Sequence, residues 1–228
     1  NIFSALLGRF YTIQQAGYYS QGSKWTTMGY STIFGMINSV GQPVFREASE
    51  DRQRLQNIFR KLMRFTAFVS FPAMLGLAIV SQELIVISIT EKWLPCVPVM
   101  QILCVWGAFM PISTLYSNLM NSIGRPNVYM WNTIALGIFQ LLCVWGSYPY
   151  GLNIMLIVYT AANIFWLLIW HYFAHKHIGI SLLNTLKDIA PYLIISVAVM
   201  TFTYWVAGYV KNIYLSLLVK IADRKSVV

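Results

Sequence analysis

Residues 126–175 read PNVYMWNTIALGIFQLLCVWGSYPYGLNIMLIVYTAANIFWLLIWHYFAH and contain no Asp, Glu, Lys or Arg. A membrane-spanning helix needs about 20 mostly apolar residues, so this run is too long for a single span. It must fold back on itself, and residues 146–151, Gly-Ser-Tyr-Pro-Tyr-Gly, supply the residue types of a turn. The run therefore predicts two consecutive helices that cross a membrane.

Further charge-free runs lie on both sides of this one, at residues 25–45, 65–82, 93–124 and 189–210. Of the 228 residues, 57% are hydrophobic and only 10% are charged, whereas soluble domains are about 45–50% hydrophobic. We predict an all-α membrane protein, a polytopic bundle with partial helices at both ends, about 1–10 and from about 212. The six full spans are predicted at about 22–44, 63–88, 95–119, 127–147, 151–173 and 189–210.

The basic residues are distributed unevenly between the two ends of these spans. Four of them, Arg9, Lys24, Lys92 and Lys211, fall on one side of the membrane. Twelve fall on the other side: Arg46, Arg52, Arg54, Arg60, Lys61, Arg64, Arg125, Lys176, Lys187, Lys220, Arg224 and Lys225. Because positive residues accumulate in cytoplasmic loops, the side with twelve is predicted to be cytoplasmic. The net charge of +9 thus comes from residues that flank apolar spans, and we expect no nucleic-acid partner.

Residues 46–64 are predicted to form a cytoplasmic amphipathic connector. Its apolar residues recur at helical spacing on one face, and they are Leu55, Ile58, Phe59, Leu62 and Met63. The basic residues of the segment take other positions. Two interpretations remain open, an interfacial helix that lies on anionic lipid and a plain connector between spans.

No arrangement of catalytic residues is visible. The Asp and Glu residues lie at predicted loops or span ends, and the three cysteines have neither metal-site spacing nor an even count. His171 and His175 have the i, i+4 spacing of two metal ligands on one helix face, but no acidic or cysteine partner is near, so we interpret them as a polar cap. We expect no enzyme activity, no metal and no cofactor.

Several short motifs occur in order in about the first 130 residues. They are Gly8-Arg9-Phe10-Tyr11, Ala16-Gly17-Tyr18-Tyr19-Ser20, Pro43-Val44-Phe45, the FPAMLGL of residues 71–77, the EKWLP of residues 91–95, the VPVMQIL of residues 97–103 and the SIGRPN of residues 122–127. Their order and spacing resemble those of Wzx-type polysaccharide or O-antigen flippases. The resemblance implies the multidrug/oligosaccharidyl-lipid/polysaccharide (MOP) exporter superfamily, whose members have two helical lobes around a central cavity. Beyond residue 130 only the hydrophobic pattern is similar.

The resemblance implies that residues 1–228 are the C-terminal lobe of such a flippase. Proteins of this family move undecaprenyl-pyrophosphate-linked oligosaccharide across the bacterial inner membrane by alternating access, for lipopolysaccharide, capsule or exopolysaccharide assembly. The implied partners are the lipid-linked oligosaccharide, membrane lipids and the N-terminal lobe of the same protein. Residues 222–228 depart from the family pattern, and the sequence leaves open whether they are native.

Positive side chains in a cavity would offset the free energy of moving a pyrophosphate through hydrocarbon. Arg9 follows an apolar stretch and precedes aromatic residues, Lys24 enters the next predicted span, and Arg125 lies at a cytoplasmic junction where a phosphate would enter. These three are the candidate substrate-binding residues. The alternative for each is a snorkelling anchor, whose charged end reaches the membrane surface.

Five polar residues lie inside predicted spans: Gln101, Asn118, Asn121, Asn132 and Asn163. Their side chains either line a cavity or form hydrogen bonds between helices.

Three other functions compete with a flippase. A polytopic polymerase or glycosyltransferase needs a large extracytoplasmic loop or an acid pair, a drug exporter of the same superfamily would be favoured by an intramembrane acid, and a scaffolding membrane protein needs neither.

Overall fold

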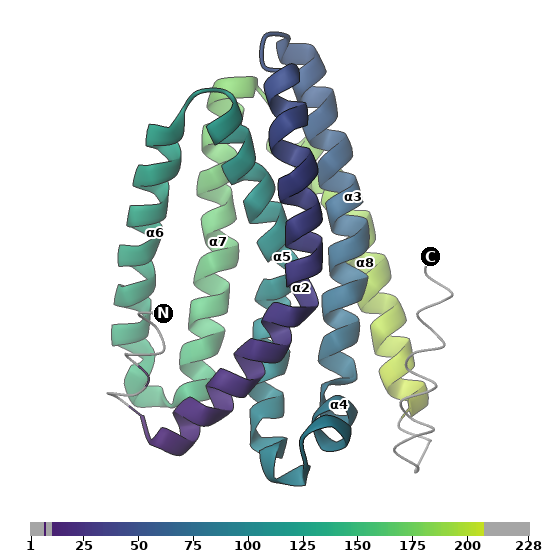
Figure 1. Cartoon of the computed structure of the whole chain (residues 1–228), viewed down its shortest axis with the longest axis vertical. Coiled ribbons are helices and arrows are strands. Elements are labelled where there is room, and N and C mark those ends of the chain that lie inside the picture. The colour runs from purple at the N-terminus through teal and green to yellow at the C-terminus, as the bar shows by residue number, and fades with distance from the viewer. Residues whose placement is uncertain (1–6, 8–10, 208–228) are drawn as a thin grey trace.

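The structure is a computed structural model that describes residue 7 and residues 11–207. The described elements are all helical (Figure 1). In chain order they are α2 (Ile13–Glu47), α3 (Arg52–Ile79), α4 (Ser81–Ser88), η1 (Glu91–Cys96), α5 (Val97–Ser122), α6 (Pro126–Ser147), η2 (Tyr148–Tyr150), α7 (Leu152–Ile178) and α8 (Leu182–Ala207). The predicted all-α class is confirmed for this part of the chain. The two predicted partial helices, at about 1–10 and from about 212, fall outside the described residues, apart from residue 7.

Five helices in the described part are long and apolar enough to cross a membrane, at 52–79, 91–122, 126–150, 152–178 and 182–205. The predicted count of six is therefore not confirmed. The predicted span at 22–44 lies within α2, which is 35 residues long but is not among these five. The protein is a multi-pass membrane protein.

The predicted span at 63–88 is divided in two. α3 ends at Ile79, and α4 begins at Ser81 as a separate helix of 8 residues. The Ser81 hydroxyl donates a hydrogen bond of 2.7 Å to the carbonyl of Ala78, and so satisfies one of the acceptors left open at the end of α3. Ser81, Gln82 and Glu83 form a short polar interruption at this break, but the apolar residues on both sides of it were predicted as one span.

The turn predicted at residues 146–151 is confirmed. α6 ends at Ser147, η2 covers Tyr148–Tyr150, and α7 begins at Leu152. Gly151 has φ of 95°, a conformation that residues with a Cβ atom rarely adopt. The charge-free run of residues 126–175 thus forms the antiparallel pair α6 and α7, which lie side by side in Figure 1.

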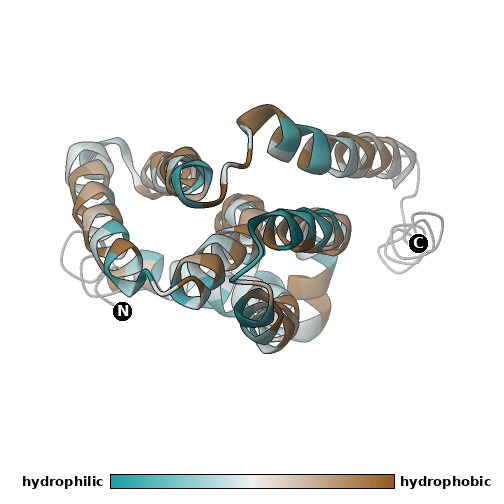
Figure 2. Ribbon diagram, turned by 90° about the horizontal axis from the view of Figure 1, so that it is seen from above, coloured by the Kyte–Doolittle hydropathy of each residue, from teal (hydrophilic) through white to brown (hydrophobic). Residues whose placement is uncertain are grey.

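α5 is the centre of the bundle and packs against α2, α3 and α7 (Figures 1 and 2). Its side chains Met100, Ile112, Leu115 and Tyr116 are almost completely buried. α6 packs on the outer side of α7, and α8 packs mainly on α3. α6 exposes mostly apolar side chains, as a helix in contact with lipid does.

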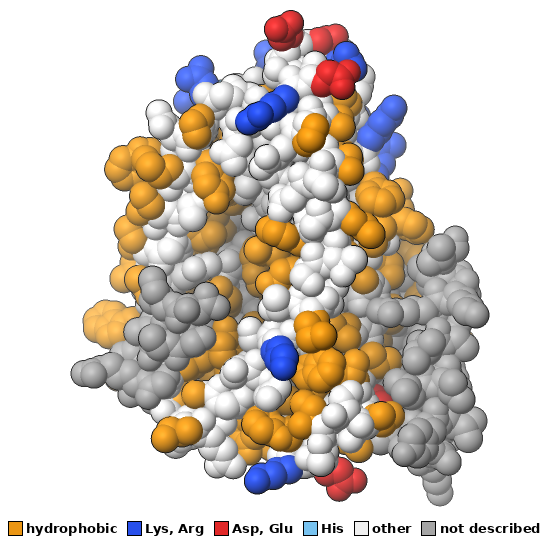
Figure 3. All heavy atoms as spheres, in the orientation of Figure 1, with side chains coloured by type: hydrophobic (Ala, Val, Ile, Leu, Met, Phe, Trp, Pro, Cys, Tyr) orange, Lys and Arg blue, Asp and Glu red, His pale blue; other side chains and the backbone are white. Residues whose placement is uncertain are grey.

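One end of the bundle carries the α2–α3, α5–α6 and α7–α8 turns, and most of the described basic residues lie at or near it (Figure 3). We call it the basic end and define it by Arg46, Arg52, Arg54, Arg60, Lys61, Arg64, Arg125, Lys176 and Lys187. On the predicted opposite side, Lys24 and Lys92 lie within the described residues, whereas Arg9 and Lys211 do not. That the basic end is cytoplasmic stays a prediction.

The predicted connector is not a separate helix, because residues 52–64 form the first half of α3. Its apolar residues Leu55, Phe59 and Met63 are each 2% exposed or less and belong to the protein core. The interpretation that this face rests on lipid is therefore wrong, since α5 and the other helices of the bundle cover it.

Four side chains at steps of four residues on α3 bind the α7–α8 region. Arg52 donates a hydrogen bond of 3.0 Å to the carbonyl of Ile178, which also accepts from Gln56. Arg60 and Arg64 pair with Asp188 of α8. We call these four side chains the α3 ladder. They hold the C-terminal end of α7 and the first turns of α8 against the bundle.

Candidate functional site

α2 has one face that is fitted closely to α5. The buried positions along it include Gly22, Thr26, Ile33, Ile37 and Gly41. A Cβ atom at Gly22 would lie 3.0 Å from a methyl group of Val99 and 3.1 Å from the backbone nitrogen of Met100. Only a glycine permits this approach between the two helices.

Away from α5, α2 exposes a row of polar residues beside the apolar side chains Met28, Met36 and Val40. The polar residues recur at helical spacing, interrupted only at Gly35, and we call this surface the α2 polar face: Ser20, Lys24, Thr27, Ser31, Ser39 and Gln42. Figure 3 shows a band with few hydrophobic side chains along α2, between apolar flanks. This face explains why α2 is not among the helices apolar enough to span.

A polar face of this length is not suited to lipid contact. At 1.5 Å per residue, Ser20 and Gln42 are about 33 Å apart along the axis, which is about the thickness of the hydrocarbon core. Hydroxyl and amide groups need hydrogen-bond partners that hydrocarbon cannot give, and a charged lysine in mid-bilayer costs at least about 2.5 kcal/mol. Residues of this kind normally face a hydrated cavity or another part of the protein.

Lys24 is the charged group of this face. It is exposed, and the ion pairs found among the described residues join Arg54 to Glu47 and both Arg60 and Arg64 to Asp188. None of these pairs involves Lys24. The ammonium group is therefore available to a negatively charged ligand.

An amide network fixes the end of the polar face nearest the basic end. Asn118 of α5 donates to the side-chain oxygen of Asn38 at 3.0 Å, and its own oxygen accepts from Gln42 at 3.1 Å. Ser122 adds a hydrogen bond of 3.3 Å to the Gln42 carbonyl. α2 is thus held to α5 by polar bonds here and by close glycine contact further along.

The polar residues predicted inside spans bond mainly between helices. Asn163 of α7 accepts from Gln140 of α6 at 2.8 Å, and Asn132 of α6 accepts from the Trp166 indole of α7 at 2.6 Å. Gln101 of α5 donates to the carbonyl of Ala78 at 3.3 Å. For these three residues, as for Asn118, bonding between helices is the interpretation that the structure supports.

The structure does not bring the predicted substrate-binding residues together. Arg9 lies outside the described residues. Lys24 is about six turns, or about 34 Å, from the end of α2 at Glu47, whereas Arg125 is exposed at the start of α6, at the basic end. Lys24 and Arg125 can therefore contact one ligand only in succession or at distant points.

Sequence reasoning missed two features. The hydroxyl residues of the α2 polar face were not singled out, although their spacing of three or four residues was visible. Asp188 was assigned to a span end, but its side chain is 7% exposed and lies against Arg60 and Arg64 from a helix far away in sequence. No local pattern indicates that contact.

The histidines have separate partners. Nδ1 of His171 lies 3.2 Å from the Tyr116 hydroxyl, and Nδ1 of His175 lies 2.9 Å from the Ile180 carbonyl. Among the described residues, no cluster of three or more His, Cys, Asp or Glu could hold a metal ion.

The fold and the α2 polar face define a multi-pass helical membrane protein with one long helix whose exposed side is polar. Residues 1–98 match a family described as polysaccharide biosynthesis protein. The resemblance to Wzx-type polysaccharide flippases, indicated by the motifs of the first 130 residues, is thereby confirmed.

Two curated relatives match over 140 residues, which is 61% of this chain. The lipopolysaccharide biosynthesis protein WzxC of Escherichia coli is 27% identical, with 28% of its length covered. The teichuronic acid biosynthesis protein TuaB of Bacillus subtilis is 26% identical, with 29% covered. A membrane protein of the cps region of Klebsiella pneumoniae is 30% identical over 110 residues, 48% of this chain and 23% of its own length. The chain thus spans less than a third of the length of these relatives.

A solved structure has the same fold. The lipid II flippase MurJ, in an inward closed conformation, superposes with a TM-score of 0.70 at 17% identity. The match covers 93% of this chain and 46% of MurJ. At this identity the likeness concerns the arrangement of helices.

Proposed function

We propose that the chain is one lobe, the C-terminal one, of a flippase that moves a lipid-linked oligosaccharide across the bacterial inner membrane. The observation that carries this proposal is the α2 polar face, which is exposed along about the thickness of the hydrocarbon core. The names of the matched proteins support it, because two belong to polysaccharide or lipopolysaccharide assembly and the structural neighbour is a lipid II flippase.

The α2 polar face would line the hydrated path of the glycan. Its hydroxyl groups both donate and accept hydrogen bonds, as sugar hydroxyls do, so they can replace water around a glycan without strict selectivity. Lys24 would offset the charge of the pyrophosphate of an undecaprenyl-linked substrate. Arg9 and Arg125 remain further candidates, with Arg125 placed where a cytoplasmic phosphate would enter.

Alternating access would proceed by movement of this lobe against a second one. The chain covers 46% of the matched flippase, which supports a partner lobe of similar size. Within this lobe, α2 is fixed to α5 by the Gly22 contact and by the Asn118 network. The substrate path would therefore open between lobes, where the α2 polar face is exposed, rather than inside this one.

The rival functions are less well supported. A drug exporter would be favoured by an acid in the middle of a span. The two buried acids among the described residues are Asp188, which is paired with two guanidinium groups, and Glu83, which lies in the first turn of the short helix α4. A polymerase or glycosyltransferase would need a pair of acids or a large extracytoplasmic loop. The turn between α6 and α7 lies opposite the basic end, on the side predicted to be extracytoplasmic, and its helix η2 covers only Tyr148–Tyr150. The proposed protein is accordingly a transporter and not an enzyme.

Complementation tests the proposal. The full-length gene should restore glycan display in a strain that lacks its flippase, and Lys24→Ala should reduce display severalfold while lipid-linked intermediate accumulates on the cytoplasmic side. Lys24→Arg should keep most of the activity because it retains the charge, and Lys92→Ala is the matched control because Lys92 is also exposed but lies in η1. Failure of the unmodified, well-expressed gene with its matched glycan would overturn the proposal.

A further inference from the structure

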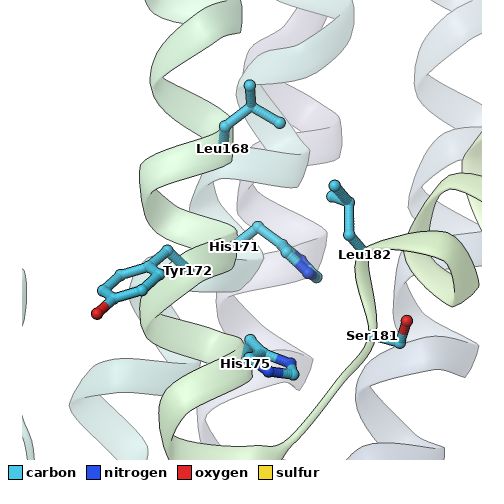
Figure 4. Close-up of a pocket in the computed structure, with 6 residues that line it drawn as sticks. All are labelled: Leu168, His171, Tyr172, His175, Ser181 and Leu182. Carbon is cyan, nitrogen blue, oxygen red and sulfur yellow. The ribbon is translucent and has the colours of Figure 1, made fainter.

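A cavity of about 370 Å³ lies between the last turns of α7 and the start of α8 (Figure 4). It is lined by Leu168, His171, Tyr172, His175, Ser181 and Leu182. The α2 polar face contributes none of these residues. Both imidazole rings point from α7 toward the segment that carries Ser181 and Leu182.

His171 brings an unsatisfied polar atom to this cavity. The residue is only 6% exposed, and its Nε2 has no hydrogen-bond partner in the described part of the chain. When the Tyr116 hydroxyl donates to Nδ1, at 3.2 Å, the ring proton resides on Nε2. A buried donor without a partner costs about 1–3 kcal/mol, so a ligand that accepts from it regains that free energy.

Two neighbouring groups, the Ser181 hydroxyl and the start of α8, are also suited to an acceptor with negative charge. His175 lines the cavity but has a different role: it must donate from Nδ1 to the Ile180 carbonyl, at 2.9 Å, because a carbonyl can only accept. That bond uses the single ring proton and fixes the orientation of the ring, so His175 offers the ligand no donor of its own. α8 begins at Leu182, and the start of a helix carries partial positive charge from its free N–H groups. The hydroxyl of Ser181 is a further donor.

The rest of the lining is apolar and open to the surroundings of the protein. Leu168, Tyr172 and Leu182 are 48%, 61% and 42% exposed. In a multi-pass membrane protein, such side chains next to a helix end contact acyl chains near the headgroup region. The cavity thus combines an acyl-chain surface with a small group of donors.

We propose that this cavity binds a phospholipid of the surrounding bilayer, with a phosphate oxygen on Nε2 of His171 and an acyl chain along Leu168 and Leu182. Ser181 and the start of α8 complete the phosphate site, and His175 forms part of its wall. The bound lipid would fill the space between α7 and α8 near the basic end. This inference does not depend on the proposed transport function.

Native mass spectrometry of the whole chain in detergent micelles tests the site. Dioleoylphosphatidylglycerol should bind saturably and about tenfold more tightly than dioleoylglycerol, which has the same chains and no phosphate, since one hydrogen bond to a charged group accounts for about that factor. Inorganic phosphate at the same concentration should not displace the lipid. Equal binding of the two lipids, or displacement by inorganic phosphate, would overturn the proposal.

Variants then locate the binding. His171→Phe should weaken phosphatidylglycerol binding about tenfold, and Leu182→Trp should do the same by filling the cavity while the bond between His171 and Tyr116 stays intact. His177→Phe is the matched control, because His177 lies outside the lining. A Leu182→Trp chain that folds and keeps full phosphatidylglycerol affinity would exclude this cavity as the site.

Discussion

The guanidinium of Arg60 on α3 binds both carboxylate oxygens of Asp188 on α8, with N–O distances of 2.7 and 3.1 Å. Arg64 approaches the same carboxylate at 3.0 Å. The two arginines are one helical turn apart, so a single acid on α8 is held by successive steps of the α3 ladder. α8 packs mainly on α3, which makes this cluster its principal charged attachment.

Asp188→Asn should destabilise the attachment of α8. The amide cannot balance two guanidinium groups, and the loss of charged hydrogen bonds should lower the free energy of unfolding by about 1–3 kcal/mol. Unfolding of the purified protein in mixed micelles would measure it. Glu47→Gln is the control, because Glu47 and Arg54 form an ion pair with both side chains more than half exposed, which should contribute less than about 1 kcal/mol. Equal losses in the two variants would contradict the assignment.

Arg60→Lys should weaken the same contact even though the charge is kept. A lysine offers a point charge instead of the planar fork that now makes two parallel bonds. We expect a loss of about 1 kcal/mol, smaller than for Asp188→Asn, because Arg64 still pairs with the acid. The same unfolding assay applies. A lysine variant as stable as the unmodified protein would show that charge alone matters at this position.

Gly22→Ala should separate α2 from α5. The added methyl group would lie 3.1 Å from the backbone nitrogen of Met100, which cannot move independently of its helix. Overpacking of this kind costs about 1–3 kcal/mol in stability. Gly35→Ala, on the same helix, has no atom within 4 Å of the added carbon and should stabilise the protein by up to about 1 kcal/mol. Two changes of the same sign would refute the close contact.

Single cysteines should report water along the α2 polar face. In a background without the three native cysteines, Thr27→Cys and Ser31→Cys should react with a membrane-impermeant maleimide in the assembled protein. Ile138→Cys, on the apolar exposed side of α6, should not react. Modification at Ile138 but not at Ser31 would reverse the assignment of lipid-facing and water-facing sides.

The apolar helices were largely predictable from sequence because a helix that crosses lipid needs about 20 mostly apolar residues with few charges. The absence of charge in residues 126–175 identified α6 and α7 and their turn, and the turn is as expected. The same reasoning did not separate α3 from α4 at Val80, because the polar residues Ser81, Gln82 and Glu83 are too few to end an apolar run, and the apolar residues before and after them were predicted as one span.

The candidate site was less predictable. Lys24 was found because a charge inside an apolar region is conspicuous, yet the serines and threonines around it carry no charge and were overlooked. The basic residues within the segment 46–64 were predicted only to lie off the apolar face, with no partner assigned, whereas Arg52, Arg60 and Arg64 bind groups of α7 and α8. Those contacts join residues more than 120 positions apart in the sequence, so no local sequence pattern indicates them.

The length of α2 has a mechanical consequence. Its 35 residues extend about 52 Å, well beyond the hydrocarbon thickness of about 30 Å, and in Figure 1 its first half slants away from the upright direction of the second. α2 is anchored to α5 near Gly22 and again near Asn38, so the two helices should move as one body. A tilt of this pair by about 10° about the Asn38 contact would carry the start of α2, about 37 Å away along the helix, through about 6 Å.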